Sequence, residues 1–419
     1  MAKRILVYAD WETLGQATLV GTLIADEVRG REIFSFEYTR AWLESAHKQM
    51  LDPDLQLFSG PQYLNDVKPN FGMFLDSSPD RWGRVLMKRR EAIIARQEGK
   101  VVRGLNESDF LLGVFDATRM GGLRFKETAD GEFLSHATEL AVPPWVTMRE
   151  LEYASLQLEN EALPVADELR WLNMLMAPGS SLGGARPKAS VADTAGNLWI
   201  AKFPSTNDET DIGAWEMIVS ELAVKAGLNT APAQLNRFSS RHHTFLTSRF
   251  DRIRQSGRIH FASAMTLLGQ QDGADFNSGA SYLDIAAFII RNGRNVNENL
   301  KQLWTRMTFN ILVKNTDDHL RNHGFLLRKD GWELSPAYDL NPNPRGSGLT
   351  LNISEADNSL DTELALSVAK HFRLNGKEAE DILDHIIQEV AQWRITALKY
   401  KLSRKEIENM APAFSAVTA

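Results

Sequence analysis

The chain has 419 residues, of which 43% are hydrophobic and 24% charged, and its formal net charge at pH 7 is −7. These values are ordinary for a globular protein with two or three domains, and the acidic balance argues against bulk binding of nucleic acid. Cysteine is absent, which excludes disulfides, thiolate chemistry and cysteine-based zinc sites. No apolar run reaches membrane-spanning length, so we expect a cytoplasmic protein without membrane contact.

The first 140 residues are expected to be rich in β-structure. Three strand-like runs, Arg4–Ala9, Ala17–Ile24 and Glu32–Tyr38, are separated by turn residues and predict an antiparallel meander. Apolar spacing then predicts a helix over Asp80–Arg96. This helix carries six basic residues, which indicate either a docking face for an acidic partner or DNA, or an ordinary solvated helix face.

Residues 141–255 mix helical and strand patterns. After Ala262 the pattern is almost wholly helical until Asn315, and again from Asp361 to Leu402. The predicted elements of these two regions are a helix over Leu151–Met176 that Pro164 interrupts, a hairpin of Ser190–Asp193 with Asn197–Phe203, a helix over Thr210–Ala226, strands at Gln234–Phe238 and His243–Arg249, and a hairpin of Gly324–Leu327 with Trp332–Leu334. The order of the elements predicts an α+β protein.

The loop before the hairpin of Gly324–Leu327 with Trp332–Leu334 contains the candidate catalytic residues. Helical spacing ends at Asn315–Asp318, a run of turn-forming residues. Asp317 and Asn322 have the D-x-x-x-x-N spacing of a protein-kinase catalytic loop, and Asp339 follows the hairpin. Phosphoryl transfer requires a carboxylate near the attacking hydroxyl, and an Asn and a second Asp that hold magnesium. In isolation the same residues are typical of loop capping.

The middle of the chain supplies the other parts in the order of a kinase. Ser180–Lys188 is a glycine-containing loop before a strand, Lys202 lies on an apolar strand, and Glu216 falls in the next helix. Thr247–Arg252 ends a strand where a kinase has its adenine-binding hinge. Each part also has a plain structural explanation, such as a flexible turn or a surface lysine, but the ordered set favours a kinase.

A metal-dependent hydrolase is the main competing interpretation of the same loop. His319 and His323 are four residues apart, but the glutamate of H-E-x-x-H is missing, and Arg321 between them would repel a cation. A serine hydrolase is not favoured either, since the chain has no G-x-S-x-G.

On these motifs the chain resembles the HipA family of serine/threonine protein kinases, the toxins of bacterial type II toxin–antitoxin systems. The resemblance covers nearly the whole sequence. It is carried by YADWETLGQATLVGTL at 8–23, NFGMFLDSSPDRWGR at 70–84, MGGLRF at 120–125, SLGGARPK at 181–188, WIAKFP at 199–204, SRFDR at 248–252, NTDDHLRNHGFLL at 315–327 and LSPAYDL at 334–340. It implies a β-rich N-terminal subdomain (1–140), a kinase-like small lobe with phosphate loop and hinge (141–255) and an all-helical C-terminal lobe with the catalytic loop (256–419).

The resemblance also implies a role for each matching residue. Asp317 would be the catalytic aspartate, and Asn322 and Asp339 would bind Mg²⁺. The positions expected at ATP are Gly183, Gly184, Ala185, Arg186, Pro187 and Lys188 of the phosphate loop, Lys202, the hinge residues Ser248, Arg249 and Phe250, Asp251 at the ribose, and His319, Asn322, Tyr338 and Asp339. Ser181, or its neighbour Ser180, falls where the family carries its autophosphorylated serine.

The partners implied are a protein substrate of translation, such as an aminoacyl-tRNA synthetase, and a HipB-like helix-turn-helix antitoxin. The stretch LNGKEAED at 374–381 has one lysine among acids, so we expect contact with operator DNA only indirectly, through the antitoxin. Two other classes stay open. One is a catalytically weak kinase-fold binding module or co-repressor for the antitoxin, and the other is a small-molecule kinase.

Overall fold

The computed structural model describes residues 2–64, 68–136, 143–159, 165–176, 184, 186–253 and 257–417. The chain divides into two compact units, of which the first comprises residues 1–206 with 251–262 and the second comprises 207–250 with 263–419. The domain boundaries predicted after residues 140 and 255 stay predictions. Among the residues with described structure, no helix is both long and apolar enough to cross a bilayer.

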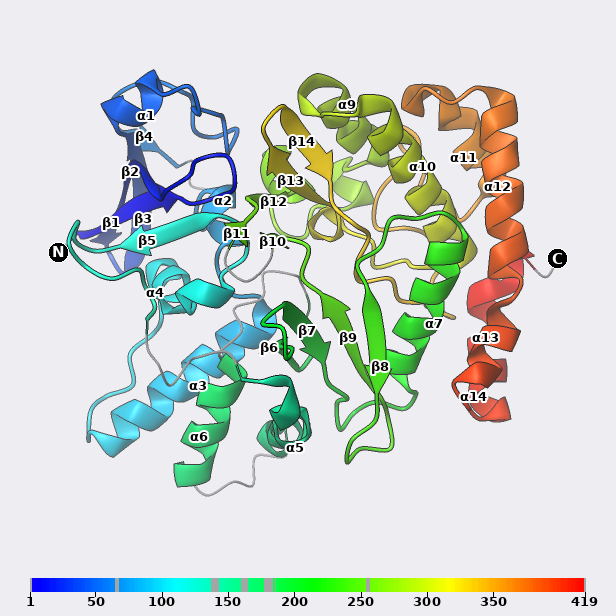
Figure 1. Cartoon of the computed structure of the whole chain (residues 1–419), viewed down its shortest axis with the longest axis horizontal. Coiled ribbons are helices and arrows are strands. Elements are labelled where there is room, and N and C mark those ends of the chain that lie inside the picture. Colours follow the sequence, from blue (N-terminus) through cyan, green and yellow to red (C-terminus); the bar gives the residue numbers. More distant parts are fainter. Residues whose placement is uncertain are drawn as a thin grey trace. The chain divides into compact units, whose positions relative to one another are not determined.

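The first unit contains a five-stranded antiparallel sheet (Figure 1), which confirms the predicted meander. The strands are β1 (Lys3–Ala9), β2 (Thr18–Val28), β3 (Arg31–Tyr38), β4 (Gln62–Tyr63) and β5 (Leu123–Lys126), in the order β4-β3-β2-β1-β5. Alternate residues of β1, namely Ile5, Val7 and Ala9, are fully buried, as expected for a sheet with one covered face. Arg29 and Gly30 both have positive φ and form the tight turn between β2 and β3.

Helices make up most of the remainder of the first unit. They are α1 (Arg40–Glu44), α2 (Gly72–Asp76), α3 (Arg81–Gln97), α4 (Glu107–Gly113), the 3₁₀ turns η1 (Asp116–Thr118) and η3 (Trp145–Thr147), α5 (Met148–Glu159) and α6 (Val165–Met176). The predicted helix over 80–96 is thus α3, and the side chain of Asp80 caps it by accepting a hydrogen bond from Gly83 N at 2.8 Å. Helix α6 packs against both α3 and α5.

Two short hairpins complete the first unit. Strands β6 (Lys188–Ala192) and β7 (Leu198–Lys202) pair antiparallel, as predicted, around a turn in which Asp193 accepts hydrogen bonds from Ala195 N and Asn197 N. Strands β10 (Arg252–Ile253) and β11 (Gly257–Arg258) form the second hairpin, which the sequence pattern does not predict. Strand β12 (Phe261–Ser263) spans the point where the chain passes from one unit to the other.

The second unit begins with α7 (Ile212–Lys225), which packs on the hairpin of β8 (Ala233–Asn236) and β9 (Thr244–Ser248). The contact between the helix and the hairpin is close at Gly213, where a Cβ atom would lie 2.4 Å from the carbonyl oxygen of His243. A glycine is therefore required at the start of this helix.

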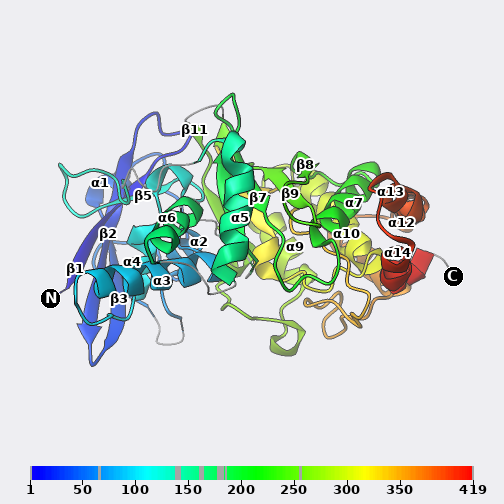
Figure 2. The same ribbon diagram turned by 90° about the horizontal axis from the view of Figure 1, so that it is seen from below.

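The helices of the second unit surround α10 (Val296–Leu312), which packs against its neighbours α9, α11 and α12 (Figure 1, Figure 2). The remaining elements of the second unit are α8 (Ala264–Leu267), η4 (Phe276–Ser278), α9 (Tyr282–Asn292), η5 (Leu320–Asn322), β13 (Gly324–Arg328), β14 (Gly331–Leu334), α11 (Thr362–Val368), η6 (Ala369–Phe372), α12 (Gly376–Val390), α13 (Trp393–Lys399), α14 (Arg404–Met410) and η7 (Ala411–Val417). Leu303, Trp304 and Phe309 of α10 are fully buried. The predicted helices and the β13–β14 hairpin are confirmed, but β12 extends the hairpin to a three-stranded sheet that the sequence analysis did not predict.

Candidate active site

The catalytic-loop candidate begins where α10 ends. Lys314 has φ of +48°, which turns the chain out of the helical direction. Asn315 N then donates a hydrogen bond of 2.9 Å to Asn310 O, and the Asn315 side-chain amide donates one of 3.1 Å to the side chain of Asn310. The loop is therefore tied to the last turns of a fully packed helix, which is a rigid support for a functional loop.

The buried carboxylate of Asp318 stabilises this loop by accepting hydrogen bonds from three side chains. It accepts hydrogen bonds from Asn310 Nδ2 at 2.7 Å, from His323 Nε2 at 2.8 Å and from the hydroxyl of Tyr282. Burial opposes the charge on Asp318, but the attraction of His323, these hydrogen bonds and the nearby Arg306 outweigh it, so the pKa of Asp318 lies below its usual value. Asp318 is thus a structural carboxylate beside the exposed Asp317.

The side chain of Asn322 is oriented by the backbone of Asp317. Asn322 Nδ2 donates a hydrogen bond of 3.0 Å to Asp317 O, and His319 N donates to the same carbonyl at 3.0 Å. The opposite end of the amide, Asn322 Oδ1, is buried and has no hydrogen-bond partner within the part of the chain that the structure describes. Because a buried polar atom normally has a partner, this oxygen fits a role as a ligand to a cation.

Asp339 has a left-handed backbone, with φ of +58°, which is uncommon for a residue other than glycine. Asn341 Nδ2 donates a hydrogen bond of 3.1 Å to Asp339 Oδ1, and Asn341 N donates to Asn315 Oδ1 at 3.3 Å. The segment after the β13–β14 hairpin is therefore hydrogen-bonded to Asn315, at the start of the catalytic-loop candidate. The amide oxygen of Asn322 and the carboxylate of Asp339 are hard oxygen donors of the kind that Mg²⁺ prefers.

No group of three or more His, Cys, Asp or Glu residues suited to a metal occurs among the described residues. Magnesium is usually held by one or two protein oxygens together with phosphates and water, not by a complete protein cage.

The predicted hinge and nucleotide residues of the second unit lie partly together. The rings of Phe250 and Tyr338 have centroids 5.5 Å apart, and the hydroxyl of Tyr338 donates a hydrogen bond of 2.6 Å to Arg321 O. Ser248 ends β9, and its N–H donates to Pro232 O at 2.9 Å. His319 precedes η5, and its carbonyl accepts a hydrogen bond from Asn322 N at 2.8 Å.

The first unit contains the predicted phosphate-loop lysine and the strand lysine, which face each other on one hairpin. Lys188 of β6 is directly opposite Lys202 of β7 in the strand register, so both side chains are on the same face. Lys188 Nζ forms an ion pair of 2.8 Å with Asp80 Oδ2, and both side chains are almost fully buried. Sequence reasoning missed Asp80, since it is 108 residues from its partner.

The predicted phosphate loop is only partly within the described residues. Ser180, Ser181, Gly183 and Ala185 lie outside them, and their predicted roles stay predictions. Gly184 has φ of +96°, a conformation that favours glycine. Arg186 and Pro187 follow it, and Pro187 O accepts a hydrogen bond of 2.9 Å from Phe203 N.

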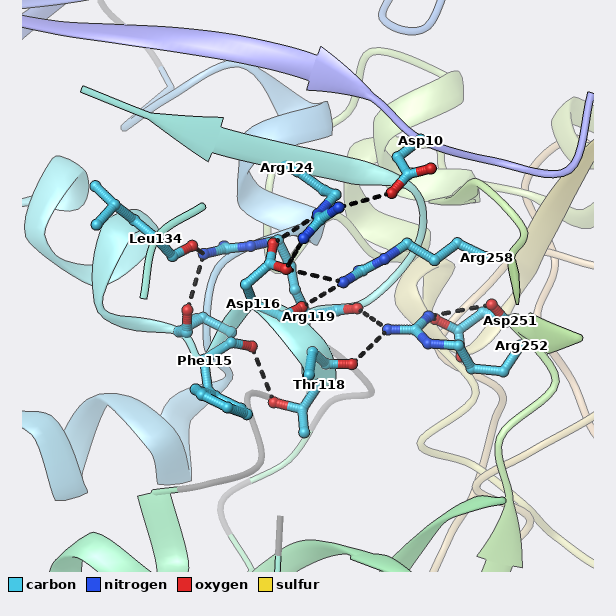
Figure 3. Close-up of polar contacts among 12 residues, drawn as sticks. Asp10, Phe115, Asp116, Thr118, Arg119, Arg124, Leu134, Asp251, Arg252 and Arg258 are labelled. Atoms are coloured by element: carbon cyan, nitrogen blue, oxygen red, sulfur yellow. Dashed lines mark hydrogen bonds and ion pairs between the residues drawn. The ribbon is translucent and has the colours of Figure 1, made fainter. Parts of the chain in front are cut away.

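Asp251, the predicted ribose contact, belongs to the first unit and is fully buried. Its carboxylate accepts hydrogen bonds from Gly121 N at 2.8 Å and from Arg252 Nη1 at 2.6 Å. Figure 3 shows the surrounding polar cluster, in which Arg252 also donates to Arg119 O and Asp116 pairs with further arginines. Asp251 therefore supports the fold of the first unit, and its contact with a ribose stays a prediction.

Three of the six basic side chains of α3 are engaged inside the first unit. Arg84 makes a two-pronged ion pair with Glu107, at 2.6 and 2.8 Å, and Arg90 Nε donates to Asn173 Oδ1 at 2.9 Å. Arg89 donates to a backbone carbonyl of α5. These arginines fasten α3 to its neighbours, so neither a docking face nor a merely solvated face describes them.

Comparison of the sequence and of the structure with known proteins shows the family to which the chain belongs. Residues 180–394, just over half of the chain, match the family model of the HipA-like C-terminal domain. The chain belongs to the HipA-like family. The structure of HipA from Shewanella oneidensis, solved with HipB and operator DNA, has the same kinase-like fold as this HipA-like chain. The TM-score is 0.67 at 18% identity, over 99% of this chain and 95% of that one.

Two curated relatives share a shorter stretch with this HipA-like chain. A protein of Haemophilus influenzae described as "Putative kinase" is 28% identical over 128 residues, 29% of this chain and 37% of the relative. "Putative kinase Y4mE" of Sinorhizobium fredii is 28% identical over 147 residues, 34% of this chain and 33% of the relative. The chain thus spans about a third of the length of the curated relatives it matches.

Proposed function

We propose that this HipA-like protein is an ATP-dependent serine/threonine protein kinase. The observation that carries the proposal is the geometry of the D-x-x-x-x-N loop. Asp317 is exposed, while the amide of Asn322 is oriented by the Asp317 carbonyl and keeps its buried oxygen available for a cation. The half-buried Asp339 follows on a segment fastened to the same loop. These are the three side chains that phosphoryl transfer requires.

In the proposed reaction, the hydroxyl oxygen of a Ser or Thr forms a bond to the γ-phosphorus of ATP. The bond from that phosphorus to the β–γ bridging oxygen breaks, and ADP leaves. Asp317 orients the hydroxyl and accepts its proton. Asn322 and Asp339 would hold Mg²⁺, which would neutralise charge on the phosphate oxygens.

The other predicted nucleotide residues complete the proposal. Lys202 and the loop from Gly183 to Lys188 contact the phosphates, and the hinge from Ser248 to Phe250 contacts adenine, with Tyr338 behind the Phe250 ring. Asp251 acts near the ribose, and His319 is a further residue at the nucleotide. Catalysis then comes mainly from positioning and from neutralisation of charge.

For the biological role, we propose a toxin that phosphorylates a translation protein, such as an aminoacyl-tRNA synthetase, in the cytoplasm. A HipB-like helix-turn-helix antitoxin would be the partner, and operator DNA would be reached through it. Support comes from membership of the family and from the fold shared with a HipA that was solved with HipB and operator DNA.

We further propose inactivation by autophosphorylation of Ser181, or of Ser180. A phosphate there would add roughly two negative charges at neutral pH, close in sequence to Arg186 and Lys188. These charges would compete with ATP for the same cations. Mass spectrometry after incubation with ATP should find this phosphate, and the modified protein should bind ATP more weakly. An active preparation with both serines unmodified would contradict the proposal.

The experiment that tests the function is incubation of the protein with ATP labelled at the γ-phosphate, Mg²⁺ and a cell extract. Label on a protein band, stable as phosphoserine or phosphothreonine, supports the proposal. Label on a small molecule would favour a small-molecule kinase. Label nowhere, in a preparation that still binds an antitoxin, would favour a binding module or co-repressor.

A further inference from the structure

A chain of three asparagines connects the buried carboxylate of Asp318 to the proposed magnesium ligand Asp339. Asn310, near the end of α10, donates from Nδ2 to Asp318 at 2.7 Å, and its Oδ1 accepts from Asn315 Nδ2 at 3.1 Å. Asn315 Oδ1 in turn accepts from the backbone N–H of Asn341 at 3.3 Å, and Asn341 Nδ2 donates to Asp339 Oδ1 at 3.1 Å. All five residues belong to the second unit, so the proposed metal ligand is connected to the interior of that unit.

The carboxylate of Asp318 fixes the direction of the hydrogen bonds that lead to Asn341. An ionised carboxylate only accepts hydrogen bonds, whereas an amide side chain has a donor end and an acceptor end. Asn310 therefore presents Nδ2 to Asp318 and Oδ1 to Asn315. Asn315 then presents Oδ1 to the N–H of Asn341. Since Asn310 and Asn315 are only 0% and 1% exposed, packing also holds them, and the backbone of Asn341 has a fixed support.

The side chain of Asn341 uses its donor end but not its acceptor end. Nδ2 donates to Asp339, while Oδ1 is buried and has no hydrogen-bond partner among the residues that the structure describes. The opposite orientation of the amide would place Oδ1 against the Asp339 carboxylate, where two acceptors repel each other. A buried acceptor without a partner lowers stability. A local cost of this kind beside a proposed metal ligand is typical of a residue kept for function.

The backbone of Asp339 does not by itself set the direction of its carboxylate oxygens. The residue has the left-handed φ of +58°, and the torsion that turns an aspartate carboxylate has broad minima. The amide of Asn341 restrains one of the two oxygens. Because this donor is neutral, it leaves the negative charge that attracts a cation in place.

We infer, on the basis of the proposed kinase function, that Asn341 is a positioning residue that orients Asp339 for Mg²⁺. Asn341 is not itself a metal ligand, and it lies outside the D-x-x-x-x-N spacing and the nucleotide residues assigned above. The hydrogen-bond partners of metal-binding side chains typically change metal affinity by about 10- to 100-fold. Asn341 therefore sets the concentration of Mg²⁺ that the site requires.

Binding of a non-hydrolysable ATP analogue to the full chain, measured by calorimetry at increasing Mg²⁺ concentrations, tests this role. Asn341→Leu removes the donor and keeps the size of the side chain. It should raise the Mg²⁺ concentration at half-saturation at least about tenfold, while the affinity for the analogue in EDTA stays unchanged. The melting temperature should stay the same or rise, because the substitution also removes the buried oxygen that has no partner. Asn343→Leu, which replaces an exposed amide on the same segment, is the matched control and should change neither the Mg²⁺ requirement nor the affinity in EDTA.

A Mg²⁺ requirement of Asn341→Leu equal to that of the unsubstituted protein would overturn the role of Asn341 and leave the proposed function standing. A lower melting temperature together with weaker binding of the analogue in EDTA would also overturn it, because a residue that only supports the fold has that effect. If Asn341→Leu fails to fold, Asn341→Ala takes its place, with the same expected rise in the Mg²⁺ requirement. An unsubstituted protein that binds the analogue equally well with and without Mg²⁺ would instead reject the proposed function, and the role of Asn341 with it.

Discussion

Asn322 is the residue on which the proposed metal site depends most. Asn322→Ala removes the buried amide oxygen and should lower the affinity for Mg²⁺, measured by calorimetry with a non-hydrolysable ATP analogue, by at least about tenfold. The matched control is Asn343→Ala, which removes an exposed amide that donates to the Thr316 hydroxyl and accepts from Arg345 N. Equal magnesium affinity in both variants would remove Asn322 from the metal site.

Asp318 should make stability depend on pH. Its folded pKa lies below the unfolded value of about 3.9, so the unfolded state takes up the proton first as the pH falls. The stabilisation is therefore complete above about pH 4 and is lost as the pH falls through the folded pKa. Asp318→Asn should cost about 3 kcal/mol at pH 7, since it removes the charge from a buried cluster, and should flatten the acid limb.

Urea unfolding at pH 7 and at pH 3 measures both effects. A variant with the same loss of stability at the two pH values would show that the charge of Asp318 is not what stabilises the loop. His323 and Tyr282, which contact the carboxylate, are unchanged in this comparison.

At the scale of elements, Asp80 links the start of α3 to the start of β6. One oxygen caps the helix and the other pairs with Lys188. Asp80→Asn keeps the cap and removes the charge, so we expect a loss of about 3 kcal/mol because the buried ion pair is broken. Asp80→Ala should cost about 1 kcal/mol more, because it also removes the cap.

Thermal unfolding of Asp80→Asn and Asp80→Ala separates the stability due to the ion pair from the stability due to the helix cap. If Asp80→Asn is as stable as the unsubstituted protein, the buried ion pair does not hold β6 in place. The same variant should bind ATP more weakly if Lys188 contributes to the phosphate site, because the Lys188 ammonium would lose its ion pair with Asp80.

The sequence predicts a helix or strand correctly wherever the hydrophobic pattern of that element lies within a short stretch of the chain. The meander, the β6–β7 and β13–β14 hairpins and α3 follow from alternation, helical spacing and turn residues over short windows. Strands β10 and β11, of two residues each, are too short to produce such a pattern. They pair because the neighbouring arginine and aspartate side chains hold the segment (Figure 3).

At the scale of the whole molecule, spacing along the chain indicated the catalytic candidates but not their supports. Asp317 and Asn322 are five residues apart, so a local motif finds them. The residues that hold Asp317 and Asn322 in position lie far away in the sequence or belong to no recognisable motif. Tyr282 is 36 residues from Asp318, and Asn315 and Asn341 meet only after the hairpin has folded. Non-local contacts of this kind have no sequence period to reveal them.

The most direct test of the central claim is phosphoryl transfer by Asp317→Ala, with labelled ATP, Mg²⁺ and the protein substrate found in the extract experiment. Asp330→Ala, which removes an exposed carboxylate from the β13–β14 turn, is the matched control. We expect Asp317→Ala to lower the rate of protein labelling by about a hundredfold or more while its melting temperature stays unchanged. Asp330→Ala should label at the normal rate. Labelling by Asp317→Ala at the rate of the unsubstituted protein would contradict the account.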